Sequence, residues 1–117
     1  MTLIIKSQIR NVTSLTLTEN QRIIDYLQGA VYCWCKNRKD EWFSARDLFG
    51  GDNFDWRGTP LITLYKKHKS KGKNDNDAIK AAGIDVGWIL KKVINNDARK
   101  FETKDNEGRI RKYRWIK

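Results

Sequence analysis

A predicted helix after Asp85 carries the residues of this 117-residue chain whose types and spacing are best suited to chemistry. One side is apolar at helical spacing and should face the core: Val86, Ile89, Leu90 and Val93. The other side repeats this spacing with Trp88, Lys91, Lys92 and Asn95. Lysine neutralises phosphate or contacts guanine, and asparagine can form two hydrogen bonds with adenine. We expect this exposed stripe to suit a groove of duplex nucleic acid. The same residues also suit a solvated face, and Trp88 could instead pack beneath a following hairpin.

The segments 99–104 and 109–116 predict a β-hairpin whose loop places Gly108 in the left-handed conformation. Its basic residues are Lys100, Lys104, Arg109, Arg111, Lys112 and Arg114. They outnumber the acidic residues of the same segment by more than protection of an exposed sheet edge requires. Contact with phosphates is therefore favoured. Alternation also places Phe101, Tyr113 and Trp115 on one face, where they could cover a core.

Glu102, Thr103 and Lys104 have the Glu-x-Lys form found in many restriction-type nucleases, where an upstream aspartate completes a magnesium site. The available aspartates are Asp85 and Asp97. Asp85 is predicted to cap a helix, however, and Glu102 to lie beside an exposed turn. A magnesium-dependent nuclease is therefore the weaker alternative, and we predict no catalytic residue.

No metal site or cofactor is expected. The only cysteines are Cys33 and Cys35, which point about 200° apart on a helix and cannot bind one ion together. Two such cysteines also exclude a disulfide framework. The single histidine, His68, follows two lysines at a predicted helix end. The sequence contains no Gly-rich phosphate loop and no Ser-His-Asp set.

The elements that position these residues begin with a predicted N-terminal strand over residues 1–17. It rests on the alternation of Leu3, Ile5, Ile9, Leu15 and Leu17. Thr18, with Gln21 three residues later, predicts the N-cap of a long helix over 19–37. The apolar stripe of that helix consists of Ile23, Leu27, Ala30, Val31 and Trp34. The stripe could face the chain's own core or pair with a second copy across a two-fold axis.

Ser44 predicts the cap of a short helix over 45–49 that Gly50 stops. Residues 50–58 predict a loop whose Phe54 and Trp56 are either buried or displayed. Thr59 and Pro60 then predict a helix start. The apolar side of this helix consists of Leu61, Leu64, Tyr65 and His68. Residues 69–76 predict a basic, mobile loop, and nearby lysines could add diffuse phosphate contacts: Lys66, Lys67, Lys69, Lys71 and Lys73.

Asp77 predicts the cap of a short helix over 78–82 that Gly83 ends, and Asp85 the cap of a second helix to about Asn96, closed by Asp97. This order of short helix, glycine turn, longer helix and basic hairpin resembles the winged helix-turn-helix superfamily over residues 77–116. Gly83 falls at the turn glycine and Ile89 at the buried aliphatic position, whereas Ile79 replaces the expected alanine. The resemblance implies that the second helix enters the major groove and that the hairpin contacts DNA as the wing.

The net charge of +10 is unevenly distributed, because residues 59–117 hold 16 of the 24 basic side chains but only seven of the 14 acidic ones. This asymmetry points to a polyanionic partner for the second half of the chain. The apolar runs are too short for a membrane-spanning helix, and the amino end lacks the features of a signal peptide. We therefore expect no membrane partner.

The expected fold is one α+β domain over residues 1–117, of winged-helix type. Its parts are an N-terminal strand region (1–17), a helical part (18–68), the basic loop (69–76) and a helix-turn-helix with its wing (77–117). The expected function is binding of double-stranded DNA, in transcription regulation, replication or the service of a mobile element. A protein-interaction module that displays Trp42, Trp56 and Trp88 is the alternative. The expected location is the cytoplasm, or the nucleoid in a bacterium.

Overall fold

Four helices and one antiparallel hairpin form the described part of the chain. The computed structural model describes residues 11–38, 40–50, 55–106 and 110–116, apart from the side chains of residues 105, 106 and 110. In chain order the elements are α1 (Leu17–Asn37), α2 (Ala45–Phe49), α3 (Ile62–Ser70), α4 (Asp75–Asn96), β1 (Lys100–Asn106) and β2 (Ile110–Ile116). The expected α+β class is confirmed. None of the described helices is long and apolar enough to span a membrane.

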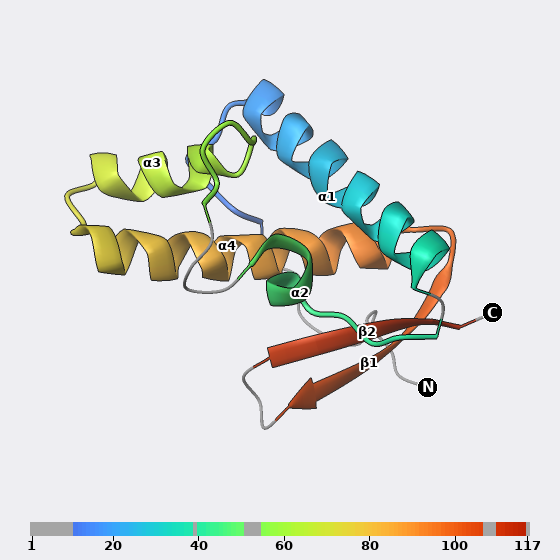
Figure 1. Cartoon of the computed structure of the whole chain (residues 1–117). Helices are drawn as coiled ribbons and strands as arrows, with labels where there is room; N and C mark the ends of the chain where they lie inside the picture. Colours follow the sequence, from blue (N-terminus) through green and yellow to red (C-terminus); the bar gives the residue numbers. More distant parts are fainter. Residues whose placement is uncertain (1–10, 39, 51–54, 107–109, 117) are drawn as a thin grey trace.

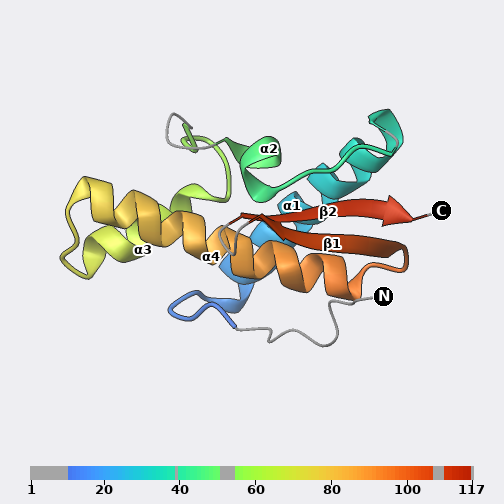
Figure 2. The same cartoon turned by 90° about the horizontal axis from the view of Figure 1, so that it is seen from below.

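The longest described helix, α4, is central to the fold, with α1 and α3 above it and the hairpin below in the view of Figure 1. Seen from below, the hairpin crosses α1 and the C-terminal half of α4 (Figure 2). The buried apolar residues of α4 are Ala78, Ala82, Val86, Ile89, Leu90, Val93 and Ile94. They recur every three or four residues along the whole helix, so one apolar stripe serves all the elements packed around it.

The prediction of two helices separated at Gly83 is wrong. α4 continues through Gly83 for 22 residues, and its N-cap is Asn74, whose side chain accepts a hydrogen bond from the backbone of Asp77 at 2.8 Å. Asp77 and Asp85 therefore cap no helix. A mid-helix glycine costs only about 1 kcal/mol relative to alanine, less than burial of one large apolar side chain contributes. The helix-turn-helix on which the winged-helix resemblance rested is absent from residues 77–96.

α1 begins two residues earlier than expected. Thr16, and not Thr18, forms the capping box, since its hydroxyl accepts from the Glu19 amide at 3.1 Å while Glu19 accepts from the Thr16 amide at 2.8 Å. A carboxylate in the first turn also suits the positive end of the helix dipole. Leu17 consequently lies in α1, 90% exposed, and residues 11–16 form no strand. Leu3, Ile5 and Ile9 lie outside the described residues.

The apolar stripe of α1 packs against the protein's own core. Ile23, Leu27, Val31 and Cys35 are buried in the common core, whereas Ala30 and Trp34 are only half-buried. The stripe that could have paired with a second copy is thus occupied by the chain's own core.

Half of the predicted basic loop over 69–76 is helical. α3 continues to Ser70 and α4 starts at Asp75, so only residues 71–74 connect them. Gly72 makes this short turn possible with a φ of 95°, a conformation that other residues rarely adopt. By contrast, α2 has the predicted bounds, because Ser44 and Asp47 form its capping box and Gly50 ends it.

A cluster of buried charges joins α3 to α4. Asp85 forms an ion pair with Lys67 Nζ at 2.9 Å and lies 2.7 Å from His68 Nε2, and the three side chains are only 6–15% exposed. Lys67 Nζ also donates to the Thr13 carbonyl at 2.8 Å, which fixes the segment before α1. Buried charges require such partners because desolvation is otherwise costly.

The corner between α4 and β1 is anchored to α1 through Asp97, whose side chain is only 3% exposed. Asp97 accepts from Gln28 Nε2 of α1 at 2.8 Å and from the Arg99 backbone at 2.9 Å. The Arg99 guanidinium lies over the rings of Tyr32 and Trp115, 4.5 and 5.5 Å from their centres. These contacts set the direction in which the hairpin leaves the helix.

The predicted hairpin is confirmed, with Phe101 opposite Trp115 and Thr103 opposite Tyr113. Its predicted loop around Gly108 falls outside the described residues. Phe101 and Tyr113 are buried and Trp115 is half-buried, so these residues cover the core as expected. Phe43 extends this small sheet by an isolated antiparallel bridge to Tyr113 of β2. Its amide donates to the Tyr113 carbonyl at 2.9 Å, and the Tyr113 amide donates to the Phe43 carbonyl at 2.8 Å.

A continuous α4 predicts that Gly83→Ala stabilises the protein. A Cβ at this position meets nothing within 4 Å, and Gly83 is not among the glycines with positive φ. The free energy of unfolding should rise by about 1 kcal/mol in urea titrations. A loss of similar size would instead show that Gly83 occupies a left-handed turn.

The buried charge cluster predicts that Asp85→Ala lowers the free energy of unfolding by about 3 kcal/mol, because Lys67 and His68 lose their shared acceptor. Asp25→Ala is the control, since Asp25 is an exposed aspartate that accepts from Gln21 on α1. The control should change stability by less than about 0.5 kcal/mol in the same urea titrations. Equal effects of the two substitutions would contradict a stabilising role for the cluster.

Candidate nucleic-acid interface

The hairpin sorts its side chains onto two faces by strand alternation. Phe101, Thr103 and Tyr113 lie on the face toward the core, as the pairing register requires. The opposite face, which we call the outer hairpin face, carries Lys100, Glu102, Lys104, Lys112, Arg114 and Ile116. Four of the six basic residues predicted for the hairpin therefore share one surface.

Trp42 belongs to the same surface. Phe43 is fully buried and pairs with Tyr113, so its preceding residue points to the other side of the sheet. The half-buried Trp42 ring lies 4.5 Å from Lys104 Nζ and 4.8 Å from the Arg114 guanidinium, measured to the ring centre. An indole flanked by two cations offers both stacking and charge. The sequence indicated Trp42 only as a residue that could be displayed to a protein partner, because its place beside the hairpin depends on the bridge through Phe43.

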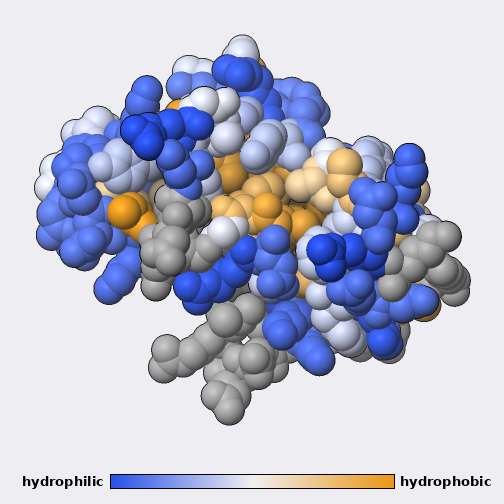
Figure 3. Space-filling view, in the orientation of Figure 1, coloured by the Kyte–Doolittle hydropathy of each residue, from blue (hydrophilic) through white to orange (hydrophobic). Residues whose placement is uncertain are grey.

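The charges of the outer hairpin face are only partly neutralised. Glu102 accepts from Arg114, with Nε at 2.8 Å. Lys104 and Lys112 stand directly opposite each other on the two strands, an arrangement that destabilises a hairpin through like-charge repulsion. A bound polyanion would relieve this repulsion. On the side of the molecule seen in Figure 3, hydrophobic residues gather near the centre, and the region of the hairpin is predominantly hydrophilic.

Arg111 does not join this surface. Arg111 pairs with Asp105 in the register and therefore lies on the core-facing side, where it borders a groove between α2 and α4. Arg109 lies outside the described residues. The five described basic residues expected to act as one wing are thus divided between two faces.

The stripe predicted to be exposed on the second helix is not an open surface. Lys91 is only 6% exposed, with Nζ 5.2 Å from the centre of the Trp88 ring. Lys92 donates to Asn11 Oδ1 at 3.3 Å, and both Trp88 and Asn95 are half-buried. This loss of exposure is caused by segments that are distant in the sequence. The segment before α1 covers one flank of this part of α4, and α2 and the hairpin border the other flank. The prediction that these four side chains form an open, exposed stripe is therefore wrong for Lys91, and the other three are half-buried.

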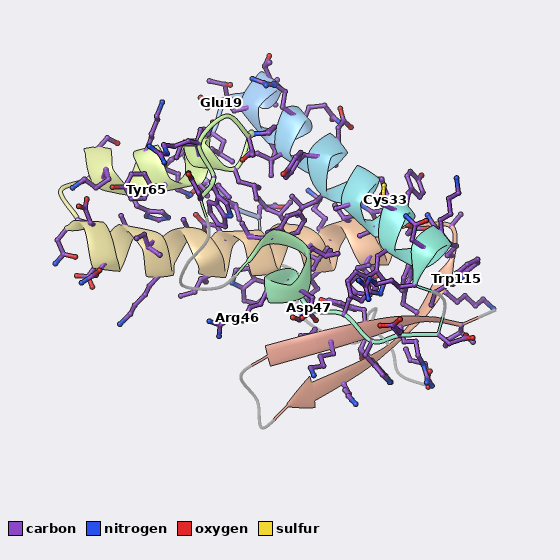
Figure 4. All side chains as sticks on the ribbon, viewed as in Figure 1. Glu19, Cys33, Arg46, Asp47, Tyr65 and Trp115 are labelled. Atoms are coloured by element: carbon purple, nitrogen blue, oxygen red, sulfur yellow. The ribbon has the colours of Figure 1, made fainter. Side chains whose placement is uncertain are left out.

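Two of the lysines among residues 66–73 already form ion pairs with aspartates of α4. Lys67 belongs to the buried charge cluster, and Lys69 lies 2.9 Å from Asp75. Tyr65, seen between α3 and α4 in Figure 4, donates to the same carboxylate at 2.8 Å. The hydrogen bonds from Lys69 and Tyr65 lower the pKa of Asp75, and they raise the pKa of Lys69 and of Tyr65. Lys66, Lys71 and Lys73 remain exposed.

The described residues do not form the magnesium site of the nuclease alternative. Asp85 is held by Lys67 and His68, Asp97 by Gln28 and Arg99, and Glu102 by Arg114. No group of three or more His, Cys, Asp or Glu side chains that could hold a metal occurs among them. Cys33 is exposed and Cys35 buried, in keeping with their opposite directions on α1. Burial raises the pKa of the Cys35 thiol, an effect that Arg99 partly offsets.

Of the three tryptophans considered for display to a protein partner, Trp56 is not available. It is 6% exposed, and its indole donates to the Phe49 carbonyl at 3.0 Å. Phe54 lies outside the described residues. This burial weakens the sequence argument for a surface built from Trp42, Trp56 and Trp88.

Comparison of the chain with protein-family models, with curated proteins and with solved structures finds no match. A functional proposal for this chain therefore rests on the geometry of the site.

Proposed function

We propose that this protein binds nucleic acid, with duplex DNA as the favoured partner, through the outer hairpin face. The observation that carries the proposal is the sharing of one face by Lys100, Lys104, Lys112 and Arg114, with Lys104 and Arg114 over the ring of Trp42. Among the described side chains of this face, Glu102 is the one carboxylate. The net charge of +10 supports it, because that charge attracts a polyanion over a longer range.

A two-stranded ribbon can enter the major groove of B-DNA or follow its phosphates. The outer hairpin face has the dimensions of such a ribbon, two paired strands of seven residues each. Lysine and arginine side chains position a protein on the phosphates, whereas base-edge contacts specify sequence. Because the basic residues dominate this face, we expect most of the affinity to be electrostatic and to depend steeply on salt. The duplex is thus bound by the hairpin, without the helix insertion expected from the sequence.

The test compares duplex affinity at salt concentrations between roughly 50 and 200 mM for the parent and for Lys104→Ala/Lys112→Ala. Loss of two phosphate contacts should weaken binding and reduce the slope of log affinity against log salt by about 2. Removal of the opposed lysines should not destabilise the fold, since it also removes their repulsion. Single-stranded DNA and RNA of the same sequence are measured in parallel.

The control is Arg22→Ala/Lys36→Ala, which removes the same charge from exposed positions on α1. This variant should keep nearly the parent slope. If both double variants change the slope equally, binding depends on net charge alone and the assignment to the hairpin is wrong. If the parent binds none of the three nucleic acids, the proposed function itself fails.

A further inference from the structure

The outer hairpin face carries one ion pair, Glu102 with Arg114, between two cross-strand pairs that contain lysine. The side chains of Glu102 and Arg114 are 41% and 37% exposed, so both are accessible to a partner. A carboxylate at this position repels phosphates, and a face that served phosphates alone would bind them more tightly without it. The presence of Glu102 among the lysines therefore needs a reason other than attraction of the phosphate backbone.

Glu102 occupies only one edge of the Arg114 guanidinium. Its Oε1 accepts from Nε of Arg114 at 2.8 Å and also from Nη2. Within the part of the chain that the structure describes, Nη1 of Arg114 donates to no acceptor. The edge formed by Nη1 and Nη2, which we call the end edge, can therefore donate two parallel hydrogen bonds to a pair of neighbouring acceptors.

A second contact fixes the plane of the same guanidinium. Its central carbon lies 4.8 Å from the centre of the Trp42 ring, an arrangement that is favourable for a cation over an indole. Glu102 thus holds Arg114 along one edge and Trp42 contacts it on one face. An arginine fixed in this way loses little conformational entropy when its end edge binds a ligand. The pair with Glu102 and the contact with Trp42 stay in place during this binding.

Guanine offers the pair of acceptors that an arginine end edge matches. Its O6 and N7 atoms lie side by side in the major groove, whereas adenine presents one acceptor and one donor there. The major groove is about 12 Å wide and admits a two-stranded ribbon. Alternate residues of a strand are about 7 Å apart, so the long side chains of Lys100 and Lys104 can reach phosphates while Arg114 meets a base edge.

We propose that Arg114 recognises guanine in the major groove of duplex DNA, and that Glu102 is the positioning residue that directs the end edge of Arg114 to the base. This proposal rests on the proposed function, because it assigns base recognition to the same outer hairpin face. The lysines supply attraction to the phosphates, and the ion pair of Glu102 and Arg114 supplies discrimination between base pairs.

The experiment compares the affinity of the parent for three duplexes of equal length, at one salt concentration of roughly 100 mM. Their sequences alternate guanine with cytosine, adenine with thymine, and inosine with cytosine. The inosine–cytosine pair has the major-groove edge of G·C but lacks the guanine amino group in the minor groove. The parent should bind the G·C and inosine duplexes about tenfold or more tightly than the A·T duplex. An inosine duplex that binds like the A·T duplex would overturn recognition in the major groove.

Arg114→Lys keeps the positive charge but removes the end edge. Its preference for the G·C duplex should fall to within about twofold, while its affinity for the A·T duplex changes little. Retained affinity for the A·T duplex also shows that the variant is folded. The matched control is Arg57→Lys, which makes the same replacement in an exposed arginine paired with Asp55 outside the hairpin. The control should keep the parent preference, and a preference that survives in Arg114→Lys would overturn the proposal.

Glu102→Gln tests the positioning role, because its effects on affinity and on preference should have opposite directions. Loss of the carboxylate strengthens attraction to phosphates, so affinity for the A·T duplex should equal or exceed that of the parent. The preference for G·C should nevertheless fall by about threefold or more, because Arg114 is no longer held. Asp55→Asn removes the same charge from the Arg57 pair and should keep the parent preference. A uniform gain of Glu102→Gln on all three duplexes would overturn the positioning role.

The parent itself separates failure of this proposal from failure of the proposed function. Equal binding of all three duplexes, with the steep salt dependence expected of the lysines, would overturn recognition of guanine and leave the hairpin assignment intact. Failure to bind any of the three duplexes would overturn both.

Discussion

The uninterrupted apolar stripe of α4 is the constraint on which the other elements depend. Val86, Ile89 and Leu90 in the middle of this stripe join one core with residues of α1, α3 and the hairpin. Because the stripe runs through Gly83 without a change of register, α4 reaches from the α3 turn to the hairpin corner as one rod. The charge cluster at Asp85 then fixes α3 to it, and Asp97 fixes the direction of the hairpin. The outer hairpin face and the groove between α2 and α4 both depend on this helix for their positions.

Local signals in the sequence predicted the elements whose ends are set locally. The Ser44 cap with Gly50 predicted α2, and alternation around Phe101 and Tyr113 predicted the hairpin and its buried face. Competition between local signals caused the errors elsewhere. Thr16 and Thr18 are both residue types that suit an N-cap, and the sequence alone favoured the wrong one. Gly83 predicts a turn if only the low helix propensity of glycine is considered, but the core packing of α4 outweighs that cost. The continuous spacing of Ala78, Ala82 and Val86 was the signal for a single helix.

The site was less predictable than the fold because exposure depends on distant segments. Lys91 has the sequence position of a solvent-facing residue, yet it is 6% exposed at the border of the groove between α2 and α4. Trp42 joins the outer hairpin face only through the bridge between Phe43 and Tyr113, which are 70 residues apart in sequence. The basic residues of the hairpin could be predicted as candidates from the sequence. Their division between two faces became clear only from the pairing register of the strands. The resulting molecule carries a basic ribbon on one side of its small sheet and a groove on the other.

The central claim is that the outer hairpin face, and not α4 or the α3 lysines, meets nucleic acid. Titration of the isotope-labelled protein with a mixed-sequence duplex, followed by amide chemical shifts in NMR spectra, tests it most directly. The account predicts that shift changes concentrate in residues 41–43, 100–104 and 111–116. Changes confined to residues 66–73 or to the exposed side of α1, with the hairpin unaffected, would contradict it.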